Sequence, residues 1–171
     1  MQKKLFILFL IVPLIGSSLF ESKLEKAFNA LNEYNYFEAK RLFYKALKKH
    51  ECAASHGLSR IYLNDKNPFH NLDSARVYAL RSKGNWGTTK LKEKEKVSLF
   101  GVDSLSILHQ ADTVAFTAFN YYEKQNNLEG YAYFLEHYAW SNYIGVTIQL
   151  RNQLAFELAK SENTAKAYQA L

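Results

Sequence analysis

The sequence predicts an all-α protein made of stacked antiparallel helical hairpins, and three observations support this prediction. Apolar residues recur three or four positions apart along most of the chain, which is the period of an amphipathic helix. The 171 residues include only seven Gly and two Pro, too few for the many tight turns of an all-β fold. A hydrophobic content of 48% is sufficient for a packed core.

Residues 1–18 are predicted to be a secretory signal peptide. Two lysines precede an apolar run at residues 5–15, and the small residues Gly-Ser-Ser follow it, which is the layout of such a segment. The run is shorter than the roughly 20 residues that span a bilayer, and we expect cleavage after Ser18. The alternative is an uncleaved membrane anchor, because two more apolar residues extend the run.

The chain has one cysteine, Cys52, so an exported protein would have no internal disulfide and would depend on packing for its stability. We expect a buried structural thiol. Cys52 and His56 lie four residues apart, with His50 nearby, but a zinc site would need a further element to complete its ligand shell. We therefore expect no metal or other cofactor, and place His56 on a helix surface or in a groove.

The formal net charge is +6, or +4 without the two lysines of the N-terminal segment. The densest charge run, KLKEKEK at residues 90–96, mixes both signs and is interpreted as a solvent-exposed helix face. A nucleic-acid surface requires a stripe of a single sign. Nucleic acid is therefore not an expected partner.

The first hairpin is predicted from two amphipathic segments. The first helix begins at a Ser22 cap and ends near Tyr34. The second follows the break EYNY and has a basic last turn, which the helix dipole favours. Because the connection is short, the two helices should be antiparallel neighbours. The apolar face expected for the second helix consists of Phe37, Ala39, Leu42, Phe43, Ala46 and Leu47.

A second hairpin completes a block at residues 22–84. Its helices are CAASHGLSRIYLN (52–64) and LDSARVYALRS (72–82), separated by a loop that contains an Asn-Pro step. Ala39 and Ala75 occupy corresponding places 36 residues apart. A period of this size is typical of stacked helical hairpins.

The segment YNYFEAKRLFYKAL (34–47) resembles the second half of a tetratricopeptide repeat (TPR). In that family a Tyr precedes the second helix, and two small residues flank an aromatic so that helix backbones approach closely while the ring fills the groove. The first helix lacks the usual Trp, Leu and Gly of the family, so the repeat is described as TPR-like. The matching positions are Tyr36, Ala39, Phe43 and Ala46.

Residues 85–103 are predicted to be a linker with a short charged helix around 88–99. A second TPR-like block follows at residues 104–171, and its first helix is SLSILHQADTVAFTAFNYYEKQ, started by Asp103 or Ser104. The side chains expected to face the stack are Leu105, Leu108, Ala111, Ala115, Ala118 and Phe119.

Residues 118–134 align with residues 155–171 at a constant offset of 37. This block resembles secreted bacterial TPR-like proteins, in which such packing pairs and Asn turns recur. A solenoid needs a polar cap at each end, whereas the final AKAYQAL is apolar at its inner positions. Either the native chain continues, or the last helix docks on a partner or on a second copy. The identical pairs are Ala118/Ala155, Phe119/Phe156, Asn126/Asn163 and Tyr131/Tyr168.

No enzymatic activity is expected. The sequence has no Gly-rich phosphate loop, no cysteine pair and no Gly-x-Ser-x-Gly elbow. Four glutamates of the second block are expected at solvent-facing helix positions, so no two of them are singled out as a catalytic carboxylate pair. These are Glu123, Glu129, Glu136 and Glu157.

The resemblance implies a function in binding. Stacked hairpins hold an extended peptide or a partner helix through the first helix of each pair, and the residues expected in such a groove are Asn29, Asn32, Tyr62, Asn120 and Tyr121. The expected function is an exported scaffold or adaptor that binds a protein or peptide in the periplasm or envelope of a bacterium. The alternative is the non-catalytic N-terminal part of a longer envelope enzyme or peptidoglycan-associated protein.

Overall fold

The computed structural model describes residues 22–164, and all regular structure in this range is helical. The predicted all-α class is thereby confirmed. The predicted signal peptide and the last seven residues, including Tyr168, lie outside the described range. Within residues 22–164, no helix is long and apolar enough to cross a bilayer.

The helices of the described range are α1 (Lys23–Asn32), α2 (Tyr36–Ala46), α3 (Glu51–Leu63), α4 (Leu72–Trp86), α5 (Leu91–Ser98), α6 (Ser104–Gln125), α7 (Leu128–His137) and α8 (Ile144–Glu162). The six helices that the sequence analysis placed are present in the predicted order, and α7 and α8 follow them in the second block.

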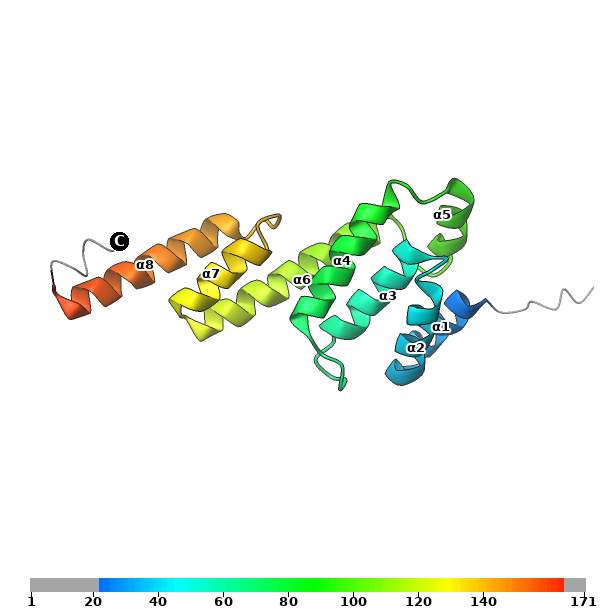
Figure 1. The fold of residues 1–171 in the computed structure, drawn as a ribbon, viewed down its shortest axis with the longest axis horizontal. Coiled ribbons are helices and arrows are strands. Elements are labelled where there is room, and N and C mark those ends of the chain that lie inside the picture. The colour runs from blue at the N-terminus through cyan, green and yellow to red at the C-terminus, as the bar shows by residue number, and fades with distance from the viewer. Residues whose placement is uncertain (1–21, 165–171) are drawn as a thin grey trace, which may run out of the picture.

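Neighbouring helices pack in succession along an elongated molecule. Helix α1 packs against α2, α2 against α3, and α3 against α4; the chain then returns with α6 against α4, and α7 and α8 continue the row. Helices α1 and α2 lie at one end, α7 and α8 at the other, and α5 lies apart from the main row (Figure 1). Each helix is thus covered mainly by its neighbours in the row.

Short polar side chains fix two predicted helix starts. The Ser22 hydroxyl accepts the Glu25 backbone N–H at 3.2 Å, and the Glu25 carboxylate accepts the Ser22 N–H at 3.3 Å. Asp103 and Ser106 form the same reciprocal pair before α6. These capping boxes satisfy backbone donors that have no partner inside the helix, and they confirm the predicted starts.

Asn126 and Asn163 both end a helix in the left-handed backbone conformation. Asn126 follows α6 with φ 45° and Asn163 follows α8 with φ 48°. Asn tolerates this region better than most residues, which explains its use at such ends. The two residues are aligned at the offset of 37 found in the sequence. The similarity of the two segments therefore includes their backbone conformation at this position.

The core of the first hairpins is built around Phe43. Its ring is fully buried and meets Phe28 edge-on, with centroids 4.9 Å apart. Ala39 and Ala46 on either side are buried as predicted. On α3, Gly57 faces the ring so closely that a Cβ at this position would lie 2.2 Å from the Phe43 Cζ atom. A residue without a side chain therefore creates the space for the ring.

The positions 36 residues later are also buried: Ala75, Ala79 and Ser82. The Cys52 thiol lies beside them and donates to the Ser82 carbonyl at 3.3 Å. The prediction of a buried structural thiol is therefore confirmed, and burial raises the pKa of this thiol.

The short charged helix expected around residues 88–99 is present as α5, and the turn after it closes over the first hairpin. Phe100 stacks on Phe28 with centroids 5.3 Å apart. Val97 and Val102 are buried. These apolar contacts hold the otherwise charged helix against α1.

Several predicted orientations are wrong. Phe37 is 69% exposed, Leu105 is 76% exposed and Leu108 is 49% exposed, although each was expected to face the stack. Helix α6 instead turns a stripe of Ile107, Ala111, Val114, Ala115 and Ala118 inward. Small residues allow the close approach of α4, so the alanines determine which face is buried and the bulkier leucines point outward.

His56 was expected on a surface or in a groove but is only 4% exposed. Helix α3 is covered on several sides, by α1, α2, α4 and α6, so even its polar residues lie inside. Helix α4 also continues to Trp86, four residues past the predicted end. This extension takes it into the segment that was expected to be a linker.

Candidate interaction surface

The five residues predicted to line a groove lie in three places. Asn29 and Asn32 are exposed on α1, and Asn120 and Tyr121 are exposed near the end of α6. Tyr62, at the end of α3, is only 8% exposed. Tyr62 contacts Tyr44 of α2 and Tyr78 of α4. The five predicted residues therefore do not line one groove.

Tyr44, Tyr62 and Tyr78 belong to a larger set, here named the aromatic surface, which spans the turn before α2, helix α2, the end of α3, the α3–α4 loop and α4. Phe37 meets Phe69 edge-on with centroids 4.8 Å apart. The Lys40 amine lies 3.9 Å from the centroid of the Phe69 ring and 5.3 Å from that of Tyr62, so a cation is held over two rings. The aromatic surface consists of Tyr34, Phe37, Lys40, Tyr44, Tyr62, Phe69 and Tyr78.

The hydroxyls of three tyrosines form a chain across this surface. Tyr78 donates to the Tyr44 oxygen at 3.2 Å, and the Tyr44 and Tyr62 oxygens lie 2.7 Å apart. Burial raises the pKa of Tyr78 to about 12 and also raises the pKa of Tyr44. The phenols of Tyr44 and Tyr78 are therefore neutral at physiological pH.

Three large rings of the aromatic surface are well exposed to solvent. Tyr34 is 76% exposed, Phe37 69% and Tyr44 42%, which is unusual for such large rings. Tyrosine is enriched in protein interfaces because it combines a rigid apolar ring with a polar tip. The exposure of Phe37 could have been predicted from the sequence, because Phe37 lies two residues before Ala39 and therefore on the opposite side of α2 from the buried face.

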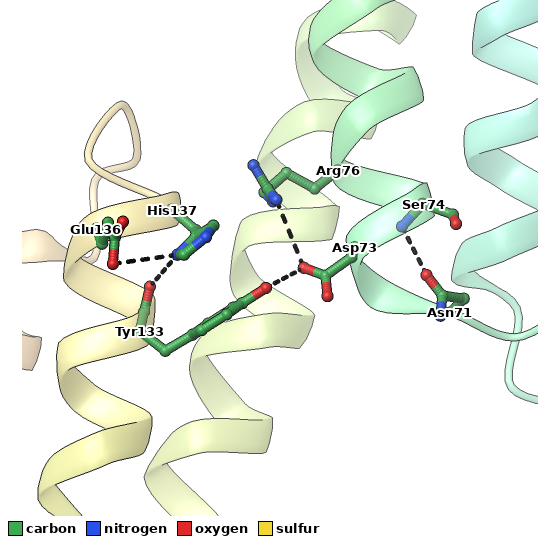
Figure 2. Close-up of polar contacts among 7 residues, drawn as sticks. All are labelled: Asn71, Asp73, Ser74, Arg76, Tyr133, Glu136 and His137. Carbon is green, nitrogen blue, oxygen red and sulfur yellow. Dashed lines mark hydrogen bonds and ion pairs between the residues drawn. The ribbon is translucent and has the colours of Figure 1, made fainter.

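A polar junction joins α4 to α7 (Figure 2). The Tyr133 hydroxyl donates to Asp73 Oδ1 at 2.6 Å, and Arg76 Nη2 lies 3.5 Å from the same oxygen. The His137 ring stacks on Tyr133 with centroids 3.9 Å apart. The hydrogen bond to Asp73 is the main cause of the raised pKa of Tyr133. The junction fixes α7 relative to the first four helices.

Buried polar atoms without a hydrogen-bond partner among the described residues gather beside this junction. They are Arg76 Nε, the Tyr138 hydroxyl and Trp140 Nε1. The Arg76 guanidinium lies 5.6 Å from the Tyr138 ring centroid, and burial raises the pKa of Tyr138. Trp140 also borders an open cavity of about 380 Å³ that Lys83 and Asp112 line. This cavity is polar but belongs to no hydrogen-bonded catalytic arrangement between the described residues.

The side chains of His50, Cys52 and His56, considered above as zinc ligands, do not form a metal site together. His50 Nδ1 lies 3.0 Å from Glu93 Oε1, while Cys52 contacts Ser82. Across residues 22–164 no group of three His, Cys, Asp or Glu side chains is placed to hold a metal ion. The four glutamates expected at solvent-facing positions of the second block are all exposed, as predicted.

The aromatic surface is therefore the strongest candidate for a functional site among the described residues. Comparison of the chain with models of protein families, with curated proteins and with solved structures finds no match.

Proposed function

We propose that the protein is an exported TPR-like interaction module that binds a protein partner of the bacterial cell envelope. The observation that carries the proposal is the aromatic surface. Tyr34, Phe37 and Tyr44 of this surface are between 42% and 76% exposed, and the Lys40 amine lies over two further rings of it. Apolar rings with hydroxyl tips are the side chains that contribute most to protein recognition.

A TPR-like solenoid is supported by the recurrence of the packing positions. Ala39, Phe43 and Ala46 of α2 are buried, and so are Ala75, Ala79 and Ser82 of α4 at the offset of 36. The two helices use the same face to contact α3, which lies between them. One hairpin cannot cover its own apolar face, so stacking explains why the pattern recurs.

The chemistry of the aromatic surface indicates the kind of partner. Lys40 is not in an ion pair with any described residue, and its amine lies over aromatic rings. A carboxylate brought to this position would meet an unneutralised cation at the edge of an apolar surface. We therefore infer that the partner presents an apolar side chain next to an acidic one.

Photo-crosslinking in cells that produce the protein would test this proposal. A photoreactive amino acid would replace Phe37 of the aromatic surface, Tyr121 of the predicted groove or Leu99, an 81% exposed control. We expect one discrete cross-linked protein from position 37 and none from position 99. Equal cross-linking from both would refute the aromatic surface, and a product from position 121 alone would favour the groove.

A second candidate function is favoured by the surface of α8. Only Thr147 and Ala159 of this helix are buried, while Phe156 is 53% and Leu158 is 44% exposed. An additional element packed here would suit the non-catalytic N-terminal region of a longer envelope enzyme or peptidoglycan-associated protein. The intact mass of the native protein from fractionated cells distinguishes the two: a mass matching residues 19–171 supports the module, and a heavier species supports the alternative.

A further inference from the structure

Two lysine-rich segments that are far apart in the sequence meet at one end of the first hairpin. Residues 45–50 cover the end of α2 and the turn after it, and residues 90–96 cover most of α5. The two segments meet where His50 Nδ1 lies 3.0 Å from Glu93 Oε1. Three open hollows of about 340, 240 and 330 Å³ adjoin one another here, because they share lining residues. Their lysines, here named the lysine face, are Lys23, Lys45, Lys48, Lys49, Lys90, Lys92 and Lys96.

The lysine face has an excess of positive charge, with seven lysines against the three nearby glutamates Glu51, Glu93 and Glu95. All seven of its lysines are exposed, and none of them is in an ion pair with another described residue. Of the two glutamates that line the hollows, Glu51 pairs with Arg81 at 2.6 Å and Glu93 pairs with His50. Two of the nearby carboxylates are thus in ion pairs and Glu95 is exposed in the α5 run. The seven lysines outnumber these glutamates, so the field at the face is positive.

The chain enters the fold on this face. Ser22 and Lys23 line one of the three hollows. The apolar run of residues 5–15 is separated from Ser22 by only six residues, a reach of at most about 25 Å for an extended chain. An apolar segment combined with a nearby basic patch is the pairing of two signals that gives stable membrane attachment.

We propose that the lysine face docks on the surface of a bilayer that contains anionic phospholipid. Before cleavage, the apolar segment at residues 5–15 would supply a hydrophobic contact with the bilayer. The lysines would supply a contact with lipid phosphates that remains after the segment is removed. This interaction goes beyond the proposed binding of a protein partner, because it uses none of the residues of the aromatic surface.

The test measures partitioning of the full chain into vesicles of phosphatidylcholine alone and of phosphatidylcholine mixed with phosphatidylglycerol. The apolar segment inserts into both kinds, so the ratio of the two partition coefficients isolates the lysine face. We expect a ratio well above one that falls as salt is added. The triple variant Lys48→Gln, Lys49→Gln, Lys90→Gln should lower the ratio about a hundredfold, since each lysine near an anionic surface contributes about fivefold.

A matched triple variant, Lys66→Gln, Lys124→Gln, Lys160→Gln, removes the same charge from exposed lysines outside the face and should change the ratio by only a few-fold. Thermal melting of both variants should match that of the parent chain, because no described contact is lost. A ratio near one for the parent chain would overturn the proposal, as would an equal loss in the two variants. Binding of soluble polyglutamate without any preference for anionic vesicles would also overturn it, in favour of an acidic protein partner.

Discussion

Replacing Gly57 by Ala should destabilise the fold even though Ala is the better helix former. The new Cβ would lie 2.2 Å from the Phe43 Cζ atom and 2.4 Å from Cε1, whereas ordinary contact begins at 3.4 Å. The Phe43 ring cannot retreat freely, because it is fully buried and already meets Phe28 at 4.9 Å. The helices α2 and α3 must therefore separate, or the ring must leave its preferred position.

The magnitude follows from two opposing terms. Overpacking of a core by one carbon costs up to ~3 kcal/mol when the neighbours cannot move. The helix propensity of Ala over Gly returns about 1 kcal/mol in a helix interior such as that of α3. The net loss in the free energy of unfolding is about 2 kcal/mol, which corresponds to a decrease in Tm of about 4–8 °C for a chain of this size.

Urea and thermal unfolding followed by circular dichroism would measure this change. Gly84→Ala in α4 is the matched control, because its Cβ meets no other atom within 4 Å; it should leave stability unchanged or raise it by up to about 1 kcal/mol. In a Phe43→Leu background the penalty of Gly57→Ala should shrink, which a double-mutant cycle detects. If Gly57→Ala is as stable as Gly84→Ala, the close contact between α2 and α3 is refuted.

Three further predictions concern buried or bridging side chains. Burial lowers the pKa of His56 from 6.5 to about 4, so the folded state holds the neutral ring. The free energy of unfolding should therefore decrease by up to ~3 kcal/mol as pH falls from 6.5 toward 4. Urea unfolding at several pH values should show a weaker dependence of this free energy on pH in His56→Leu. The Cys52 thiol, buried and with a raised pKa, should react with a thiol reagent only after denaturation; fast labelling of the native protein would contradict its burial. Tyr133→Phe removes the hydrogen bond to Asp73 and should lower the free energy of unfolding by about 0.5–1.5 kcal/mol, whereas Tyr121→Phe, on an exposed side chain, should change it by less.

The local features of the fold could be predicted from the sequence because they depend on nearby residues. The 3.6-residue apolar period located the four helices of the first two hairpins and α6, whereas α7 and α8 were predicted only as part of a second helical block. The caps Ser22 and Asp103 act on backbone groups three residues away, and the Asn126 and Asn163 turns depend on a single backbone conformation. Such interactions are complete within one turn of chain.

The sequence by itself therefore determined most of the helices, the caps at Ser22 and Asp103, and the close-packed positions Ala39, Phe43 and Ala46. Which face of each helix is buried was decided by the tertiary structure, since Phe37, Leu105 and His56 took orientations that depend on helices far along the chain. The same holds for both candidate surfaces. The aromatic surface gathers side chains from three helices, and the lysine face forms only when residues 45–50 and 90–96 meet at the contact of His50 with Glu93. Packing contacts and charge fields act through space, and only the folded chain brings these groups within reach of one another.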